Sequence, residues 1–346
     1  MRGLVIKSTG SSYVVRLDDG QDVECHVKGN FRIRGIRSTN PVAVGDWVKV
    51  LSDGQTDKGQ GAKGEVFWIT DVEERRNYII RKSTNLSKES HILAANIDQV
   101  ALIVTINHPQ TSTTFIDRFL ATCEAYRVPA ILIFNKTDLL SEDELAQLAN
   151  LRALYESLGY QTLAISALGG DISKTGLPEM LSGKTTLLSG NSGVGKSTLL
   201  NALFGKEMTR TGKISDAHDK GMHTTTFSEM YEYKGLRDEG PRTKELSDQV
   251  PSTKEESQSW VIDTPGIKGF GTIDFEKEEV GHFFREIFRK SSECRFGNCT
   301  HTNEPGCAVV EAVEHDEIAI SRYESYLSIL SDCEERSFGS DSKKYR

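Results

Sequence analysis

One eight-residue stretch of this 346-residue chain has the residue types and spacing of a phosphate-binding loop. It reads GNSGVGKS over 190–197 and matches the pattern G-x-x-x-x-G-K-[ST]. Glycines let the backbone wrap closely, so that successive N–H groups point at phosphate oxygens. Lys196 would bring positive charge to the β- and γ-phosphates as a catalytic group, and Ser197 would bind Mg²⁺. We therefore expect triphosphate contacts from Gly190, Asn191, Ser192, Gly193, Val194, Gly195, Lys196, Ser197 and Thr198.

A second motif would choose the base of that nucleotide. Residues 135–138 read Asn-Lys-Thr-Asp and resemble the N-K-x-D motif of the TRAFAC-class GTPases, while 166–168 resemble their S-A-x motif. The Asp138 carboxylate can accept two hydrogens from guanine, at N1 and N2, whereas adenine offers no such pair. By the resemblance, Asn135 would tie the base loop to the phosphate loop, and Lys136 would cover the base. The predicted guanine contacts are Asn135, Lys136, Thr137, Asp138, Ser166 and Ala167.

The order of these motifs is unusual. Both base motifs lie N-terminal to the phosphate loop, whereas 263–266, which resemble the D-x-x-G motif, follow it. This order predicts a circularly permuted GTPase, which is physically allowed because chain termini usually lie close together at the surface. Asp263 would hold Mg²⁺ through water. The segment after 263–266 then leads into the C-terminal domain, so nucleotide state could move that domain.

The switch region carries the remaining candidates for hydrolysis. Residues 221–226 read GMHTTT and resemble a switch I motif, G-x-H-T-T-T. By register, Thr225 would bind Mg²⁺, with Thr224 as the alternative. Ras-like enzymes place a water-orienting glutamine after D-x-x-G, but this chain has Ile267, which predicts slow intrinsic hydrolysis. His223 is the candidate replacement, and the alternative is that it only packs or hydrogen-bonds in the switch.

Three of the six cysteines crowd into one short stretch with a histidine. Their spacing is Cys-x₄-Cys-x-His-x₅-Cys, formed by Cys294, Cys299, His301 and Cys307. In a cytosolic chain such a cluster suggests a metal rather than disulfides. Three thiolates and one imidazole suit tetrahedral Zn²⁺ with no open position, which would make the site structural. The alternative is a set of reduced cysteines without a ligand.

The elements that must position these groups fall into three predicted domains. Residues 1–72 show five short strand patterns, typical of an OB-type β-barrel that could bind RNA. Residues 73–273 alternate strands and helices, which predicts a doubly wound α/β P-loop domain. Residues 274–346 read as an α-helical zinc-binding domain with a polar tail. Predicted strands are 4–7, 12–17, 22–26, 47–51, 66–70, 99–106, 130–134, 161–165, 185–189, 227–233 and 260–262; predicted helices are 114–126, 142–158, 196–204 and 316–335.

Composition limits the partners and the compartment. The net charge of −8 gives no global basic field to attract nucleic acid, so RNA contacts need a local patch. One candidate is the basic run over 28–37, with Phe31 inside it; the alternative is a solvated loop. No apolar run approaches the roughly 20 residues that cross a bilayer, and the N-terminus lacks the long apolar stretch expected of a secretory signal. We expect a cytoplasmic protein without a membrane partner, and a monomer.

Residues 234–259 are rich in charge, Ser, Thr, Pro and Gly, which predicts a disordered insertion.

Together, the barrel, the permuted motifs and the Cys-His cluster resemble the family of ribosome-small-subunit-dependent GTPases, RsgA or YjeQ. The resemblance implies GTP hydrolysis in late maturation of the small (30S) ribosomal subunit, with binding to the subunit and its rRNA and stimulation by them. Zn²⁺, Mg²⁺ and GTP or GDP are the implied ligands. Two departures are the long insertion over 234–259 and Met222, where the family usually has arginine.

Two other functions remain open from the sequence. One is a zinc-stabilised RNA-binding module in which GTP only regulates affinity. The other is a metabolic P-loop kinase, against which Asp138 argues, because guanine selection is unusual among such kinases.

Overall fold

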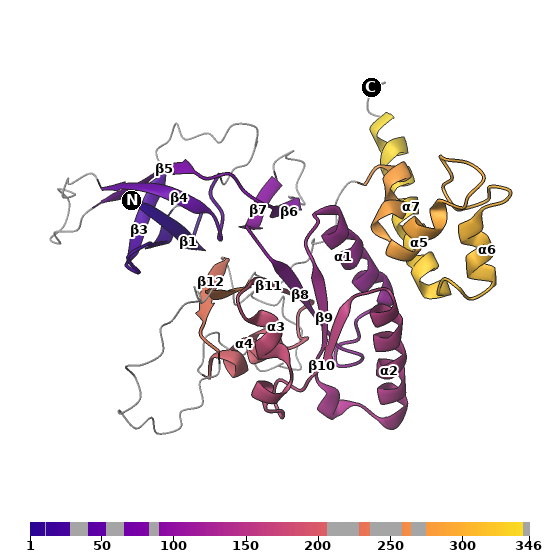
Figure 1. Cartoon of the computed structure of the whole chain (residues 1–346), viewed down its shortest axis with the longest axis horizontal. Coiled ribbons are helices and arrows are strands. Elements are labelled where there is room, and N and C mark those ends of the chain that lie inside the picture. Colours follow the sequence, from indigo (N-terminus) through magenta and orange to yellow (C-terminus); the bar gives the residue numbers. More distant parts are fainter. Residues whose placement is uncertain are drawn as a thin grey trace, which may run out of the picture.

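The computed structural model describes residues 1–10, 12–27, 41–52, 66–82, 90–205, 228–235, 258–263 and 275–341, with backbone alone at 81–82, 90–91 and 334–341. Within these ranges the chain forms a β-barrel, a central α/β layer and a helical C-terminal part (Figure 1). None of the described helices combines the length and apolar character needed to cross a membrane.

The N-terminal part is a closed five-stranded barrel. Its strands are β1 (Arg2–Ser8), β2 (Tyr13–Leu17), β3 (Asp22–Val27), β4 (Trp47–Ser52) and β5 (Phe67–Val72). They pair in the order β1-β2-β3-β5-β4, and β4 pairs back onto β1, which closes the barrel. Alternating side chains point inward, as in β2, where every second residue is buried. The predicted OB-type barrel is confirmed, and the basic run at 28–37 lies outside the described residues.

The central part is a mostly parallel sheet covered on both faces. Its strands are β8 (Gln99–Val104), β9 (Ala130–Phe134), β10 (Gln161–Ala164), β11 (Thr185–Ser189), β12 (Glu229–Tyr233) and β13 (Ser259–Asp263), in the order β10-β9-β8-β11-β13-β12. Helices α1 (Thr113–Ala125) and α2 (Glu142–Ser157) cover one face; α3 (Leu177–Leu181) and α4 (Lys196–Phe204) lie on the other (Figure 1). Along β8, Leu102 and Val104 pack toward α1, while Ala101 and Ile103 pack toward α4. Because the carboxyl ends of parallel strands share one edge, the predicted motifs after β9, β10, β11 and β13 meet there.

The barrel and the central sheet are joined by a strand pairing that the sequence did not reveal. Strand β1 pairs antiparallel with β12, with Lys7 opposite Glu229, and the whole forms one 11-stranded sheet. The Lys7 ammonium lies 3.3 Å from the Glu229 carboxylate, and Arg16 lies 3.0 Å from Glu232. A hairpin of β6 (Tyr78–Lys82) and β7 (Ser90–Ala95), also unpredicted, follows the barrel.

The C-terminal part is helical, as predicted. It contains the 3-10 helix η3 (Lys277–Phe283) and helices α5 (Arg285–Ser291), α6 (Ala308–Glu314) and α7 (Ile320–Asp341). The helix predicted over 316–335 is wrong at its start, because α7 begins at Ile320. Asp316 has a left-handed backbone with φ of 59°, and the Glu317 N–H donates to Ala312 O at 2.8 Å. Residues 316–318 therefore end α6 and cannot begin the next helix.

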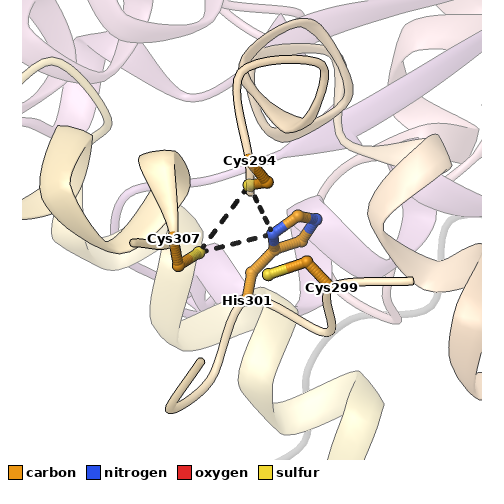
Figure 2. Close-up of side chains that lie close together, drawn as sticks. All are labelled: Cys294, Cys299, His301 and Cys307. Atoms are coloured by element: carbon orange, nitrogen blue, oxygen red, sulfur yellow. Dashed lines mark hydrogen bonds between the residues drawn. The ribbon is translucent and has the colours of Figure 1, made fainter. Parts of the chain in front are cut away.

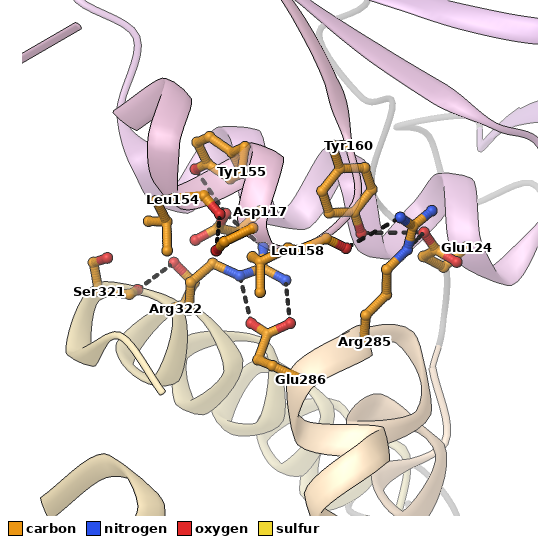
Figure 3. A network of polar contacts seen from close by, with 12 residues as sticks. Asp117, Glu124, Leu154, Tyr155, Leu158, Tyr160, Arg285, Glu286, Ser321 and Arg322 are labelled. Atoms are coloured by element: carbon orange, nitrogen blue, oxygen red, sulfur yellow. Dashed lines mark hydrogen bonds and ion pairs between the residues drawn. The ribbon is translucent and has the colours of Figure 1, made fainter. Parts of the chain in front are cut away.

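A buried network of charges fixes the C-terminal helices to α1 (Figure 3). Arg322 on α7 is 1% exposed and donates to Asp117 on α1 at 2.7 Å. It also donates twice to Glu286 on α5, at 2.6 and 3.2 Å, and lies over the Phe284 ring. The Tyr155 hydroxyl donates to the same Asp117 oxygen at 2.9 Å. Both carboxylates are thus paired with one guanidinium, which compensates for their burial.

A second polar cluster lies beside this network (Figure 3). Arg285 on α5 donates to Glu124 on α1 at 2.7 Å and to the Gly159 carbonyl at 2.9 Å. Its guanidinium lies 4.0 Å from the Tyr160 ring centre, and the Tyr160 hydroxyl donates to Glu124. The C-terminal part therefore docks on α1 through these two sets of charged contacts, and Arg118 of α1 adds a third with Asp332 of α7.

Candidate nucleotide-binding and metal sites

The predicted phosphate loop runs from the end of β11 to the start of α4. Three of its glycines have positive φ: Gly190 at 146°, Gly193 at 84° and Gly195 at 97°. A Cβ at Gly190 would lie 2.4 Å from the Ile103 carbonyl oxygen, and one at Gly195 would lie 2.4 Å from the Asn135 amide nitrogen. Both positions thus require glycine for conformation and for space. Val194 is fully buried and anchors the loop in the core.

Lys196 begins α4 and turns back into this loop. Its ammonium donates to the carbonyl oxygens of Gly190 and Asn191, the latter at 2.9 Å. Burial lowers the pKa of Lys196, and the nearby Asp263 carboxylate opposes that shift. Asp263 is the last residue of β13, is 3% exposed, and lies opposite Leu188 of β11. The structure therefore brings the lysine and the aspartate, predicted from distant motifs, to one place.

Asn135 joins the base motif to the phosphate loop. Its side-chain amide donates to the Val194 carbonyl at 2.8 Å, and its amide oxygen accepts from the Ala167 N–H at 2.9 Å. The residue is 3% exposed, so both bonds are shielded from water. Asn135 therefore links the base loop to the phosphate loop, as expected from the sequence, and it also bonds to the S-A-x segment.

Asp138 lies beside Ser166, at the outer side of this junction. The Ser166 hydroxyl donates to the Asp138 carboxylate and accepts from the Gly169 N–H at 3.1 Å. The Asp138 side chain is exposed. Base selection requires that an unpaired Asp138 carboxylate be shielded from water, because only then is its lack of a partner costly. Since the side chain is exposed, the bound base itself must provide this shielding.

A loop that sequence reasoning missed also reaches this junction. It spans 105–111, between β8 and α1. The Lys136 ammonium donates to the His108 carbonyl oxygen, and the Lys136 Cε lies 4.0 Å from where a Gly195 Cβ would be. Pro109 lies 3.4 Å from the equivalent position at Gly193. The only available signal was the position of this loop after a buried strand, at the edge where the motifs meet.

Several predicted site residues lie outside the described residues. They are Thr224, Thr225 and His223 of the switch motif at 221–226, and the D-x-x-G residues after Asp263. Ile267 and Met222 also lie outside, as do 236–257 of the predicted insertion. Ser197 and Thr198 lie in the first turn of α4, each partly exposed.

The four predicted metal ligands come together in the C-terminal part (Figure 2). The ligand atoms of Cys294, Cys299, His301 and Cys307 all lie within 4.8 Å of one another. His301 Nδ1 is 3.5 Å from both Cys294 Sγ and Cys307 Sγ, and these sulfurs are 3.9 Å apart. A zinc tetrahedron with bonds of about 2.3 Å to sulfur and 2.0–2.1 Å to nitrogen has edges of about 3.8 and 3.6 Å. The cluster therefore has the size and donor set of a closed tetrahedral metal site.

Neighbouring hydrogen bonds hold the histidine of this cluster. His301 has a left-handed backbone with φ of 54°, and its carbonyl accepts from the Tyr323 hydroxyl at 2.7 Å. The Tyr326 hydroxyl donates to the Thr300 carbonyl at 2.6 Å. Both tyrosines lie on α7, so the longest C-terminal helix orients the ligand loop.

Glu304 organises the turn between His301 and Cys307. Its carboxylate accepts from the backbone N–H groups of Thr300, Thr302 and Asn303, at 2.7, 2.9 and 3.1 Å. Burial alone would raise the pKa of Glu304, but hydrogen bonds from the Thr300 hydroxyl and from the Thr300 and Thr302 N–H groups lower it to about 2. The turn therefore contains a firmly ionised carboxylate.

Comparisons with known proteins agree with this architecture. The family model described as RsgA GTPase matches residues 72–273, and the RsgA N-terminal domain model matches 2–60. The chain is 55% identical over 335 residues to the small ribosomal subunit biogenesis GTPase RsgA of Phocaeicola vulgatus, covering 97% of this chain and 98% of that protein. It is 53% identical to the protein of that name from Porphyromonas gingivalis strain ATCC 33277, covering 96% and 97%.

Two solved structures resemble nearly the whole chain. The crystal structure of YjeQ from Thermotoga maritima matches with a TM-score of 0.67 at 32% identity, covering 96% of this chain and 98% of that one. The structure of YloQ, described as a circularly permuted GTPase, matches with a TM-score of 0.64 at 27% identity, covering 97% and 95%. The likeness therefore extends over the barrel, the central sheet and the C-terminal part.

Proposed function

The chain belongs to the RsgA GTPase family, and on that premise we propose that it hydrolyses GTP to GDP and phosphate during late maturation of the small (30S) ribosomal subunit. One observation carries the proposal. Asn135 bonds to Val194 in the phosphate loop and to Ala167 in the S-A-x segment. The motifs for base and for phosphate, reversed in the sequence, thus form one site. The alternative of an RNA-binding module with incidental GTP turnover is not favoured, because the relatives are named as GTPases.

The proposed roles follow from the motifs, together with the positions of those motif residues that the structure describes. Backbone N–H groups of the phosphate loop and the Lys196 ammonium bind the phosphates, and Asp138 accepts from guanine N1 and N2. Ser197, Thr225 and Asp263 hold the Mg²⁺ that accompanies GTP. Because Ile267 cannot orient water, intrinsic turnover should be slow. Either the ribosomal partner or His223 would supply the missing function.

The metal site belongs to the same proposal. We assign it one structural Zn²⁺, held by Cys294, Cys299, His301 and Cys307, because four such donors leave no open position for catalysis. Elemental analysis of the purified chain should give one zinc per molecule. A chain that is fully folded and contains no metal would contradict this assignment.

The proposed partners are the small subunit with its rRNA, and GTP or GDP. The proposal includes a monomer in the cytoplasm, without a membrane partner. The names of the relatives support the ribosomal part. The net charge of −8 means that any rRNA contact depends on a local basic patch.

The test is GTP turnover by the purified chain, with and without purified small subunits. We expect the subunits to accelerate phosphate release. No acceleration, with GTP still bound, would overturn the ribosomal part of the proposal and leave the nucleotide part standing.

Base selection is tested by Asp138→Asn. An asparagine amide can donate to the xanthine O2 but cannot accept two guanine hydrogens, so the variant should lose GTP and gain xanthosine triphosphate. Asp71→Asn is the matched control, because Asp71 is an exposed barrel residue paired with Lys49. Unchanged GTP affinity in Asp138→Asn would refute the guanine assignment.

A further inference from the structure

We propose that the loop over 105–111 is part of the nucleotide site, and that the Thr105 hydroxyl positions Lys136 for contact with the purine. The inference rests on the proposed function, because it assumes a guanine nucleotide beside Asp138. It assigns a role to a loop that carries none of the recognised motifs.

Thr105 closes this loop on itself. Its hydroxyl donates to the Pro109 carbonyl, and its N–H donates to the Thr111 hydroxyl at 3.2 Å. The Thr111 N–H donates back to the Thr105 carbonyl at 3.0 Å. Thr105 is 1% exposed, so water does not compete for its hydroxyl. All three bonds that close the loop therefore use one buried residue.

The closed loop presents its tip to the base motif and to the phosphate loop. At the tip, the His108 carbonyl accepts from the Lys136 ammonium, and Pro109 packs beside Gly193. The end of the Lys136 side chain lies beside Gly195. The ammonium is thus held at a fixed point, with its methylene stem crossing between the base motif and the phosphate loop.

Holding the ammonium matters because a lysine side chain has many rotamers. An unrestrained Lys136 would lose much conformational freedom when its stem covers a purine, and that loss weakens binding. The hydrogen bond to the His108 carbonyl holds the side chain in one conformation, so less of that freedom is lost on binding. The Thr105 hydroxyl acts indirectly. It holds the Pro109 carbonyl, and the neighbouring residue His108 provides the carbonyl that holds the lysine.

The mechanism predicts an effect on binding and none on the chemical step. Lys136 reaches the base side of the site, whereas Lys196 lies among the phosphate-loop carbonyls. A loosened Lys136 should therefore raise the KM for GTP and the Kd for GDP and leave kcat unchanged. A purely structural role for Thr105 would instead lower stability without this selective effect.

The test is Thr105→Val, which removes the hydroxyl and keeps the shape. We expect GDP affinity, measured by titration of the full-length chain, to fall about fivefold, the equivalent of ordering one long side chain. Thr105→Ser keeps the hydroxyl and should bind GDP like the original chain. Thr122→Val is the matched control: Thr122 is also 1% exposed and also donates to a backbone carbonyl, that of Arg118, at 2.8 Å.

A double-mutant cycle separates the route through Lys136 from a general loosening of the site. Lys136→Met keeps the stem and removes the ammonium. In that background, Thr105→Val should change GDP affinity by less than about twofold, because a methionine has no ammonium for the His108 carbonyl to hold. An undiminished fivefold effect there would overturn the inference, as would unchanged affinity in Thr105→Val alone or an equal loss in Thr122→Val. Failure of the original chain to bind GDP would instead refute the proposed function.

Discussion

Removing the buried guanidinium of Arg322 should detach the C-terminal helices from α1. Arg322→Met keeps an unbranched stem but deletes three hydrogen bonds, to Asp117 at 2.7 Å and to Glu286 at 2.6 and 3.2 Å. Asp117 is 0% exposed and Glu286 8%, so two carboxylates would remain buried without a cation. Breaking a buried ion pair from one side typically costs about 3–5 kcal/mol, and we expect a loss in that range.

Hydrogen exchange at α5 and α7 measures this loss locally. An opening free energy lowered by about 3 kcal/mol or more should speed exchange of their backbone amides over 100-fold. Amides of the buried strands β8 and β11 should change little, because the network does not touch them. Limited proteolysis should likewise release a fragment close to 275–341 earlier than in the original chain.

Arg118→Met is the matched control for this experiment. Arg118 also joins α1 to α7, through Asp332 and the Ser328 carbonyl. In this ion pair, however, the side chain of Arg118 is 28% exposed and that of Asp332 is 42% exposed. Water screens such a pair, so its loss should be about 1 kcal/mol or less. If both variants lost equal stability, or if Arg322→Met lost under about 1 kcal/mol, burial would not be the source of the network's strength.

Two further predictions concern the sites themselves. Gly195→Ala should abolish GTP binding in a nucleotide titration, because its Cβ would lie 2.4 Å from the Asn135 amide nitrogen. Gly205→Ala is the control, since Gly205 also has a positive φ, of 63°, but has open space around it. This variant should lose only about 1 kcal/mol of stability and should bind GTP normally. Glu304→Gln keeps only one acceptor oxygen for the turn of the metal site and should speed zinc release to a chelating dye about tenfold. Because the pKa of Glu304 is lowered to about 2, its contribution is complete above its usual pKa of 4.5 and is lost only as pH falls toward 2. The difference between variant and original chain should therefore stay constant between about pH 6 and pH 8, and a difference that changes there would contradict the reasoning.

Local signals in the sequence were enough to place the elements that carry the motifs. Strands β9 and β11 and helix α4 have the predicted bounds, because each is an apolar stretch with glycine or polar residues at its ends. The Cys-His cluster was equally clear, because its four predicted metal ligands lie close together in the sequence. A motif of a few neighbouring residues shows both what the site can bind and which element carries it.

Contacts between distant segments were not predictable in this way. The pairing of β1 with β12 joins residues 222 apart in the chain, and no local pattern marks it. Arg322 lies in an amphipathic helix pattern where a charge suggests solvent, yet it is buried because Asp117 and Glu286 come from two other helices. Thr105 looks like the end of an apolar strand, and its role appears only when the Pro109 carbonyl folds back over it.

The pairing of β1 with β12 also bears on how the protein can be divided. Without the first 72 residues, β12 would become an outer strand of the central sheet, with unpaired N–H and C=O groups open to another molecule. Met230 and Trp260, which lie with Leu4 around a cavity at this seam, would be uncovered at the same time. Such a fragment has the features of an aggregation-prone species, so the barrel also protects the solubility of the rest of the chain.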